Sequence, residues 1–225
     1  MRFDIIHADQ RSPEWFQARA GRLTGSRAAD MLSKIKTGEA AARRDYRLQL
    51  VCERLTGQPQ DDLFINAAMQ RGIDMEPFAR AAYEAKTGNV AVQTGFLSHT
   101  THQAGCSLDG HVQRQRSVEN FWGNQFEGIV ELKCPKSATH LRYLREGVLP
   151  KEYVPQVTHN AWISGADWVD FLSYDDRFPS DLQVFYVRVL VKDLDLAGYE
   201  QSALAFLAEV DHEVHALRGW KAGTA

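Results

Sequence analysis

Cysteine is scarce in this chain of 225 residues, and its few copies are scattered. Cys52, Cys106 and Cys134 are odd in number and form no Cys-x-x-Cys pair. We therefore expect neither a disulfide framework nor a structural zinc site. Three isolated cysteines also cannot supply the four thiolates of an ordinary iron–sulfur cluster.

Long hydrophobic runs are missing as well. No apolar stretch approaches the ~20 residues that a membrane-spanning helix needs. The N-terminus, MRFDIIHADQRSPEW, mixes apolar and charged residues and has no uninterrupted apolar core of a secretory signal. Neither an internal repeat nor a low-complexity linker divides the chain. We therefore expect a cytoplasmic protein without a membrane partner, formed by a single domain over residues 1–225.

Excess positive charge is also lacking, because the formal net charge is −3. This argues at first against a nucleic-acid partner. The distribution is uneven, however: residues 1–60 hold 11 Lys and Arg against 7 Asp and Glu, so the acidic excess lies in the rest of the chain. Such a pattern suits a protein that grips a polyanion locally and binds cations elsewhere, although an uneven solvated surface is an equally simple interpretation.

Hydrophobic periodicity and turn residues predict a mixed order of helices and strands. The predicted helices are Pro13–Ala20, a second one capped by Thr24 or Ser26 and running to about Leu32, Ala41–Leu55 with Leu48, Val51 and Leu55 on one stripe, Asn66–Lys86, Ser137–Glu146, Pro155–Ser164 and a long helix from Leu196 to about Leu217. The predicted strands are one through Val90, Val92 and Phe96, then Ala104–Asp109, Phe126–Cys134, Trp168–Tyr174 and Gln183–Val191, with a polar loop over Gln113–Gln125. This order indicates an α+β or mixed α/β domain with one central sheet.

The stretch that carries chemistry lies on the predicted strand Phe126–Cys134. Residues two apart on a strand point to the same face, so Ile129, Glu131 and Lys133 share one side. A carboxylate and an ammonium on a strand flanked by apolar residues are costly to desolvate, and a bound metal ion would offset that cost. Asp109 ends the preceding predicted strand, just before a glycine, where its carboxylate can approach Glu131.

Two carboxylates and a strand carbonyl are hard oxygen ligands that suit Mg²⁺ or Mn²⁺ rather than zinc. Such an ion lowers the pKa of its bound water and neutralises charge that grows on a phosphate. Lys133 can orient the water or stabilise the transition state as a point cation. Asp109, Glu131 and Lys133 are therefore the candidate catalytic residues of a phosphodiester-cleaving enzyme.

The Glu-x-Lys pattern alone is weakly specific, because Glu84-Ala-Lys86 repeats it. That copy lies on a predicted helix, where residues two apart diverge by about 200° and cannot share a site. Only the copy at Glu131 lies on a strand downstream of an Asp-Gly pair. The alternative interpretation of this copy is a surface salt bridge on an edge strand.

The arrangement Ser107-Leu-Asp-Gly110, a gap, then Glu131-Leu-Lys-Cys-Pro135 resembles the catalytic core of the bacteriophage lambda exonuclease family, the phage-type alkaline exonucleases of the PD-(D/E)xK superfamily. The resemblance runs over nearly the whole chain. Its further elements are Trp15-Phe-Gln-Ala-Arg19 with Leu23-Thr-Gly-Ser26, Gly72-Ile-Asp-Met-Glu76, and Pro155-Gln-Val157 with Trp162. Two departures are Leu108, where the superfamily pattern has Pro, and the long gap between Asp109 and Glu131, which implies an extended hairpin loop.

This resemblance implies a restriction-endonuclease-like fold, with a mixed sheet flanked by helices. It divides the chain into an N-terminal DNA-end-binding part (1–60), a catalytic core (61–192) and a C-terminal helix (193–218). It also implies an enzyme that digests the 5′-ended strand of linear duplex DNA to mononucleotides. The implied assembly is a homotrimeric ring that works beside a single-strand annealing protein, with two Mg²⁺ ions per site for which Mn²⁺ can substitute.

The same resemblance assigns roles to individual residues. Asp109, Glu131, the Leu132 carbonyl and Glu76 would hold the metal, and Lys133 and Gln156 would position the attacking water. The residues that match the 5′-phosphate and DNA-binding positions are Arg19, Thr24, Ser26 and Ser107. Simpler interpretations stay open: Ser26 as a helix cap, Arg19 as a solvated helix residue, and Gln156 as a polar residue without function.

Two other groups are weaker candidates. His212 and His215 lie at metal-ligand spacing but on a charged helix with no third ligand, so a solvated face is favoured. Arg43, Arg44 and Arg47 either track duplex phosphates or decorate a helix. At the level of function, the alternatives are an endonuclease of the same superfamily and a non-catalytic DNA-end-binding recombination protein.

Overall fold

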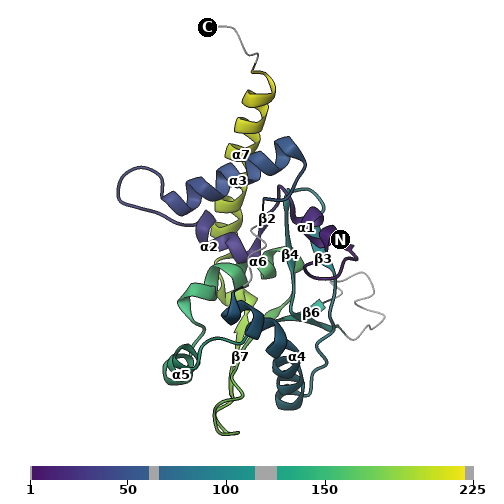
Figure 1. Ribbon diagram of the computed structural model, residues 1–225, viewed down its shortest axis with the longest axis vertical. Helices are drawn as coiled ribbons and strands as arrows, with labels where there is room; N and C mark the ends of the chain where they lie inside the picture. Colours follow the sequence, from purple (N-terminus) through teal and green to yellow (C-terminus); the bar gives the residue numbers. More distant parts are fainter. Residues whose placement is uncertain (1, 61–65, 115–125, 221–225) are drawn as a thin grey trace.

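The computed structural model describes residues 2–60, 66–114 and 126–220 (Figure 1). Its α-helices, in chain order, are α1 (Pro13–Arg19), α2 (Ala28–Met31), α3 (Ala41–Thr56), α4 (Ala67–Thr87), α5 (Ser137–Glu146), α6 (Val154–Ser164) and α7 (Leu196–Arg218). Its strands are β1 (Phe3–Ile6), β2 (Leu23–Thr24), β3 (Phe96–His99), β4 (Ala104–Ser107), β5 (Gly110–Gln113), β6 (Phe126–Lys133), β7 (Trp168–Tyr174) and β8 (Val184–Leu190). Short 3₁₀ turns are η1 (Gly25–Arg27), η3 (Lys151–Tyr153) and η4 (Val191–Asp193).

The strands form two four-stranded sheets, which corrects the expectation of one central sheet. The first has the order β1-β3-β4-β2 and the second has the order β5-β6-β7-β8. The chain leaves the first sheet after Ser107 and enters the second at Gly110, so the predicted strand Ala104–Asp109 ends two residues early. Leu108 in this link is 1% exposed and belongs to the main core. The strand therefore ends beside a buried side chain, immediately before Asp109.

The second sheet holds Glu131 and Lys133 on one of its two inner strands. β6 pairs antiparallel with β5 and parallel with β7, and β8 closes the sheet antiparallel to β7. The parallel connection from β6 to β7 contains α5 and α6, because parallel neighbours need a long crossover. That crossover places α6 beside the carboxyl end of β6.

Helices cover the sheets with apolar side chains and build three cores. The largest core gathers one face of β6 with the first sheet, α3, α6 and α7. Val130 and Leu132 from the other face of β6 pack with Ala79 and Tyr83 of α4. Tyr143 of α5 packs against Phe171 of β7 on the side away from α4. In Figure 1, α3 crosses α7 at one end of the molecule, while α4 and α5 flank the second sheet at the other. The mixed α+β class expected from the sequence is confirmed.

Most predicted elements occur with ends shifted by only a few residues. Gly57 and Gly88 terminate α3 and α4 with positive φ angles of 69° and 72°, as the sequence predicts. The Asn66 side chain caps α4 by accepting hydrogen bonds from the backbone N–H groups of Ala68 and Met69. The Gln113–Gln125 loop is only partly testable, because Gln113 ends β5 and residues 115–125 lie outside the described residues.

Several local predictions are wrong. Thr24 makes no side-chain cap hydrogen bond, Ser26 lies inside η1, and α2 begins after Arg27. Leu48 and Leu55 of α3 are 45% and 39% exposed, because Tyr46, Leu50 and Val51 form its buried face. The predicted strand from Val90 begins only at Phe96, and Val92 makes a single bridge to His111. Strand β1 was not predicted. Within the described ranges, no helix combines the length and apolar character that a membrane span needs.

Candidate active site

Asp109 is anchored to the strand that carries Glu131. Its Oδ2 accepts a hydrogen bond of 2.7 Å from the backbone N–H of Leu132. Strand β5 begins at Gly110, opposite Val130, so it does not extend far enough to pair with Leu132. The carboxylate occupies the place that a ladder partner would fill. Because the N–H and C=O of one strand residue point to the same side, the Leu132 carbonyl faces the same space as Asp109.

Glu131 is a carboxylate held in the interior by three donors. It is 2% exposed. Its Oε1 accepts hydrogen bonds from Lys133 Nζ and, at 2.6 Å, from Gln156 Nε2. Its Oε2 accepts from Asn160 Nδ2 at 3.0 Å. Gln156 and Asn160 stand four residues apart on α6, so both side chains project from one helix face. Helix α6 therefore holds the carboxylate from the side opposite the strand.

The charged groups of this site shift one another's pKa values. Burial raises the pKa of Glu131 to about 7; the Lys133 ammonium lowers this pKa and the Asp109 carboxylate raises it. Burial alone would lower the pKa of Lys133, but the carboxylates of Glu131 and Asp109 outweigh it and raise that pKa. The ammonium also lies over the ring of Tyr153, 5.2 Å from its centroid. Lys133 thus stays cationic beside a carboxyl whose pKa lies near neutrality.

Glu76 approaches the same space from α4. Burial raises its pKa, the Asp109 carboxylate raises it further, and Arg80 lowers it. Arg80 Nη2 lies 3.0 Å from Glu76 Oε1, and Arg80 Nη1 donates to the backbone carbonyl of Asp109. Arg80 therefore joins α4 to the link that carries Asp109.

A cavity of about 530 Å³ opens between these elements. Its wall contains Glu76, Asp109, Leu132, Lys133 and Tyr153. The remaining lining residues are Gln10, Arg11, Asn66, Ala68, Met69, Gly72, Ile73, Cys134 and Pro135. Three of the candidate ligand residues, Glu76, Asp109 and Leu132, and the candidate catalytic Lys133 therefore line one solvent-accessible space, whereas the buried Glu131 does not line it.

The donor chemistry of this wall fits a hard divalent cation. Asp109 raises the pKa values of both Glu131 and Glu76, which indicates carboxylates directed toward shared space. A cation there would relieve this repulsion, and carboxylate and carbonyl oxygens are the ligands that Mg²⁺ prefers. Among the described residues, no three His, Cys, Asp or Glu side chains already stand at coordination distance from one point. Glu131 is engaged by Lys133, Gln156 and Asn160 instead.

The candidate phosphate-binding residues form a second group around Trp15. The indole N–H of Trp15 donates to the Ser107 hydroxyl at 2.8 Å, and the Arg19 guanidinium stacks over the indole, 4.1 Å from its centroid. Arg19 Nη2 donates to the Ser26 hydroxyl at 3.4 Å. Arg19, Ser26 and Ser107 are thus brought together from α1, η1 and β4. Thr24 differs, because it is 4% exposed and its backbone N–H donates to the Tyr46 hydroxyl.

Asn160 is the site residue that the sequence analysis missed. Its position four residues after Gln156, on a helix that follows the strand of Glu131, was a usable signal. Its side chain lies against the backbone of Gly25, where an added Cβ would meet Asn160 Oδ1 at 2.3 Å. Gly25 therefore lets η1 approach α6 and brings Ser26 close to the carboxylate cluster.

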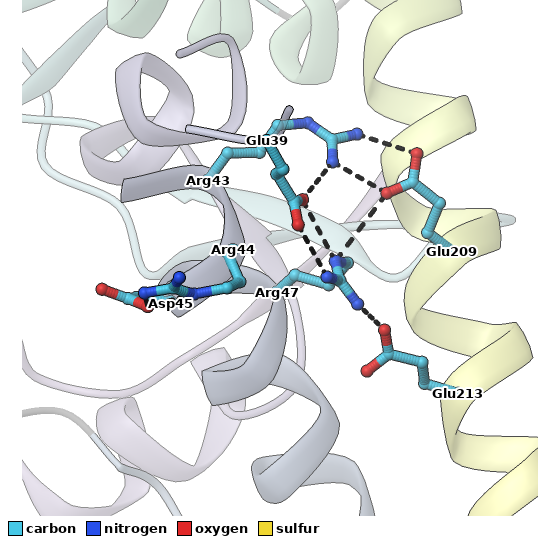
Figure 2. Close-up of polar contacts among 7 residues, drawn as sticks. All are labelled: Glu39, Arg43, Arg44, Asp45, Arg47, Glu209 and Glu213. Carbon is cyan, nitrogen blue, oxygen red and sulfur yellow. Dashed lines mark hydrogen bonds and ion pairs between the residues drawn. The ribbon is translucent and has the colours of Figure 1, made fainter. Parts of the chain in front are cut away.

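The remaining candidates lie outside both groups. His212 and His215 are exposed on α7. Arg43 and Arg47 of α3 are tied to α7, as Figure 2 shows. Arg43 binds Glu209 at 2.8 and 2.9 Å. The further ion pairs of this network are Arg43–Glu39, Arg47–Glu39, Arg47–Glu209 and Arg47–Glu213. Arg44 is exposed and pairs with Asp45, turned away from this network.

Comparison with known proteins bears on the family. The YqaJ-like viral recombinase domain matches residues 14–167. Two crystal structures of LHK-Exo, an alkaline exonuclease from Laribacter hongkongensis, share 38% and 39% identity with this chain at TM-scores of 0.79 and 0.78. Each alignment covers 92% of this chain and 96% of the other, and one of those structures is a complex with dAMP.

A phage-related exonuclease from Haemophilus somnus 129PT shares the fold at a TM-score of 0.62, with 12% identity over 87% of this chain and 96% of the other. No curated protein sequence matches significantly. The domain match spans more than half of the chain, and the LHK-Exo alignments span nearly all of it. The resemblance found in the sequence is thereby confirmed: the chain belongs to the YqaJ-like viral recombinase family, among the phage-type alkaline exonucleases.

Proposed function

We propose that this protein is a metal-dependent 5′→3′ exodeoxyribonuclease that digests the 5′-ended strand of linear duplex DNA to mononucleotides. One observation carries the proposal. Ser107 of the Arg19 group and Asp109 of the carboxylate group lie in one chain segment, at most roughly 7 Å apart along the backbone. This spacing is of the order of the distance between successive phosphates of a DNA strand. A terminal phosphate held by Arg19, Ser26 and Ser107 would therefore bring the next phosphodiester to the carboxylates.

The terminal-phosphate assignment follows from the chemistry of that group. A guanidinium and two hydroxyls are strong donors to a phosphate dianion. Stacking on Trp15 fixes the plane of the Arg19 guanidinium, and Trp15 also orients Ser107. A pocket that binds a free phosphate and reaches one nucleotide inward favours release of mononucleotides from an end. LHK-Exo, which resembles this chain, has been crystallised with the mononucleotide dAMP.

The residues that would hold Mg²⁺, or Mn²⁺ in its place, are Asp109, Glu131, the Leu132 carbonyl and Glu76, for two ions per site. When bound, the metal supplies Lewis-acid activation of water and neutralises charge on the phosphate. Lys133 contributes a fixed positive charge beside the scissile phosphate, and Gln156 an amide donor to position the attacking water. In this structure both side chains bind Glu131 Oε1, so they already stand beside the carboxylate that would hold the metal.

The biological setting follows as part of the same proposal. Strand digestion from 5′ ends leaves 3′ single-stranded overhangs, which a single-strand annealing protein would pair during phage-type recombination. A homotrimeric ring that DNA threads would keep the enzyme on its substrate. Membership of a viral recombinase family supports this setting.

The proposal is tested by offering the enzyme closed circular and linear duplex DNA of the same sequence. Mg²⁺ should permit release of mononucleotides from the linear form only, and a chelator should stop it. The Lys133→Ala variant, purified identically, controls for contaminating nucleases. Cutting of the closed circle at the same rate would show that the enzyme is an endonuclease and not an exonuclease. Binding of DNA ends without hydrolysis in Mg²⁺ or Mn²⁺ would leave a non-catalytic end-binding protein.

A further inference from the structure

Arg11 lies in the wall of the catalytic cavity with an unusual backbone conformation. Its φ is 69°, and no other non-glycine residue in the described ranges has a positive φ. A side chain in this left-handed region crowds the neighbouring carbonyl, so the position would suit glycine better. The residue is exposed, so burial of its side chain in a core does not hold it there.

Arg11 lines the cavity, and no hydrogen bond or ion pair within the described segments fixes its guanidinium. Arg80, by contrast, is bound to Glu76 and to the Asp109 carbonyl. Arg11 is nevertheless near Glu76. The pKa of that carboxyl is raised by burial and by Asp109, and Arg80 and then Arg11 lower it. Arg11 is therefore a cation beside the candidate metal ligands that keeps its donors available.

The segment around Arg11 borders two cavities. Gln10 and Arg11 line the catalytic cavity. Gln10 also lines an adjacent cavity of about 610 Å³, together with His7, Asp9, Ser12 and Glu14. The Arg19 group lines neither cavity. A DNA strand in the catalytic cavity would meet Gln10 and Arg11 in its wall.

We propose that Arg11 is a positioning residue that binds a backbone phosphate of the cleaved strand in the cavity lined by Glu76 and Asp109. The inference rests on the proposed nuclease function and extends it to a second anchor for the strand. Residues with strained backbone cluster at functional sites. A guanidinium in the wall of a cavity that receives DNA would have such a function, because it can bind a phosphate. The interaction is with phosphate oxygens, so it is independent of base sequence.

The test compares Arg11→Gly, which removes the guanidinium and relieves the strain, with Arg11→Lys and with Arg44→Ala. Arg44 is a matched control because it is an exposed arginine that pairs only with its neighbour Asp45 among the described residues. Binding of a 5′-phosphorylated duplex is measured by fluorescence anisotropy, without divalent cations, over a range of salt concentrations. Each phosphate contact contributes about 0.7 to 0.9 to the slope of log K against log salt.

Loss of this contact should reduce the slope by about 0.7 to 0.9 in Arg11→Gly. Arg11→Lys should restore the slope, and Arg44→Ala should leave it unchanged. In Mg²⁺, Arg11→Gly should raise KM for DNA more than it lowers kcat, while its melting temperature stays equal or rises. An unchanged slope in Arg11→Gly, or an equal loss in Arg44→Ala, would overturn the inference. Failure of the proposed function is separate, because it would appear as absence of hydrolysis in the wild-type protein.

Discussion

The side-chain amide of Asn160 donates a 3.0 Å hydrogen bond to Glu131 Oε2, while Gln156 and Lys133 both bind the other oxygen of the same carboxylate. Glu131 is thus held by one donor on one oxygen and two on the other, inside a site where it is 2% exposed. Hydrogen bonds to the charged form of a carboxyl lower its pKa. Asn160 therefore helps to keep Glu131 ionised and available to a metal.

Asn160→Ala should raise the pKa of Glu131 further above its value of about 7. A hydrogen bond to a charged group contributes about 1.5–3 kcal/mol, so the acid limb of the pH–rate profile should move up by about one to two pH units. The loss of activity should be larger at pH 7 than at pH 9. Thr158→Ala is the control, because Thr158 is buried on the same helix and its hydroxyl, among the described residues, bonds only the Val154 carbonyl. A loss that is uniform with pH would reduce Asn160 to a packing residue.

Metal binding should depend on pH through the same carboxyl. Folding favours the protonated form of Glu131, so the group stabilises the metal-free protein at low pH, and this contribution is lost as the pH rises through about 7. A divalent cation needs the ionised form. The rise in melting temperature caused by Mg²⁺ should therefore be small at pH 6 and grow above pH 7. A shift that is equal at pH 6 and pH 9 would contradict the role of Glu131 as a ligand.

Lys133→Ala should abolish hydrolysis and leave metal binding largely intact. Because Lys133 lowers the pKa of Glu131, the variant is compared with the wild type at pH 9, where the higher pH favours the ionised carboxyl. Nucleotide release and the Mg²⁺-induced thermal shift are then measured on the same samples. Full activity in this variant would remove the lysine from the mechanism. Loss of the thermal shift would instead make its role structural.

Arg19→Ala should weaken the preference for 5′-phosphate over 5′-hydroxyl ends. Trp15→Phe should weaken it less, because it removes the indole N–H that orients Ser107 and keeps an aromatic ring under Arg19. The ratio of initial rates on the two kinds of end is the measurement. A ratio that is unchanged in Arg19→Ala would dismiss this group as the terminal-phosphate pocket.

Arg47 of α3 should contribute to the stability of the fold and not to DNA binding. Arg47→Ala breaks the ion pairs to Glu209 and Glu213 of α7, which are part of a network, and should cost about 1 kcal/mol, a fall in melting temperature of about 2–4 °C for a domain of this size. DNA affinity of the folded protein should stay unchanged. A loss of affinity without a change in melting temperature would show that Arg47 follows duplex phosphates.

The sequence predicted those parts of the site that depend on local periodicity. Strand β6 places Glu131 and Lys133 on one face because alternation on a strand is a local property. Helix α4 follows from its Asn66 cap and its stop at Gly88, and α6 follows from its stop at Gly165. The break between the two sheets was not predicted, since it depends on burial of Leu108 against residues distant in sequence. Asn160 was missed for a similar reason. Its contact with Glu131 joins two elements whose packing no local pattern encodes.

The pairing of charges across elements was equally hidden. Arg43 and Arg47 meet Glu209 and Glu213 only because α3 crosses α7, so their sequence pattern left DNA contact and helix surface equally open. Arg11 gave no signal at all, because a positive φ at a non-glycine residue follows from the path of the loop.

The proposed 5′→3′ exonuclease activity is tested most directly with a linear duplex that carries a 5′-phosphate on one end and a 5′-hydroxyl on the other. Each strand bears its own label. With Mg²⁺, the phosphorylated strand should be lost progressively from its 5′ end as mononucleotides, while its complement stays intact. Without Mg²⁺, neither strand should change. Internal cuts on both strands, or loss from 3′ ends, would contradict the account.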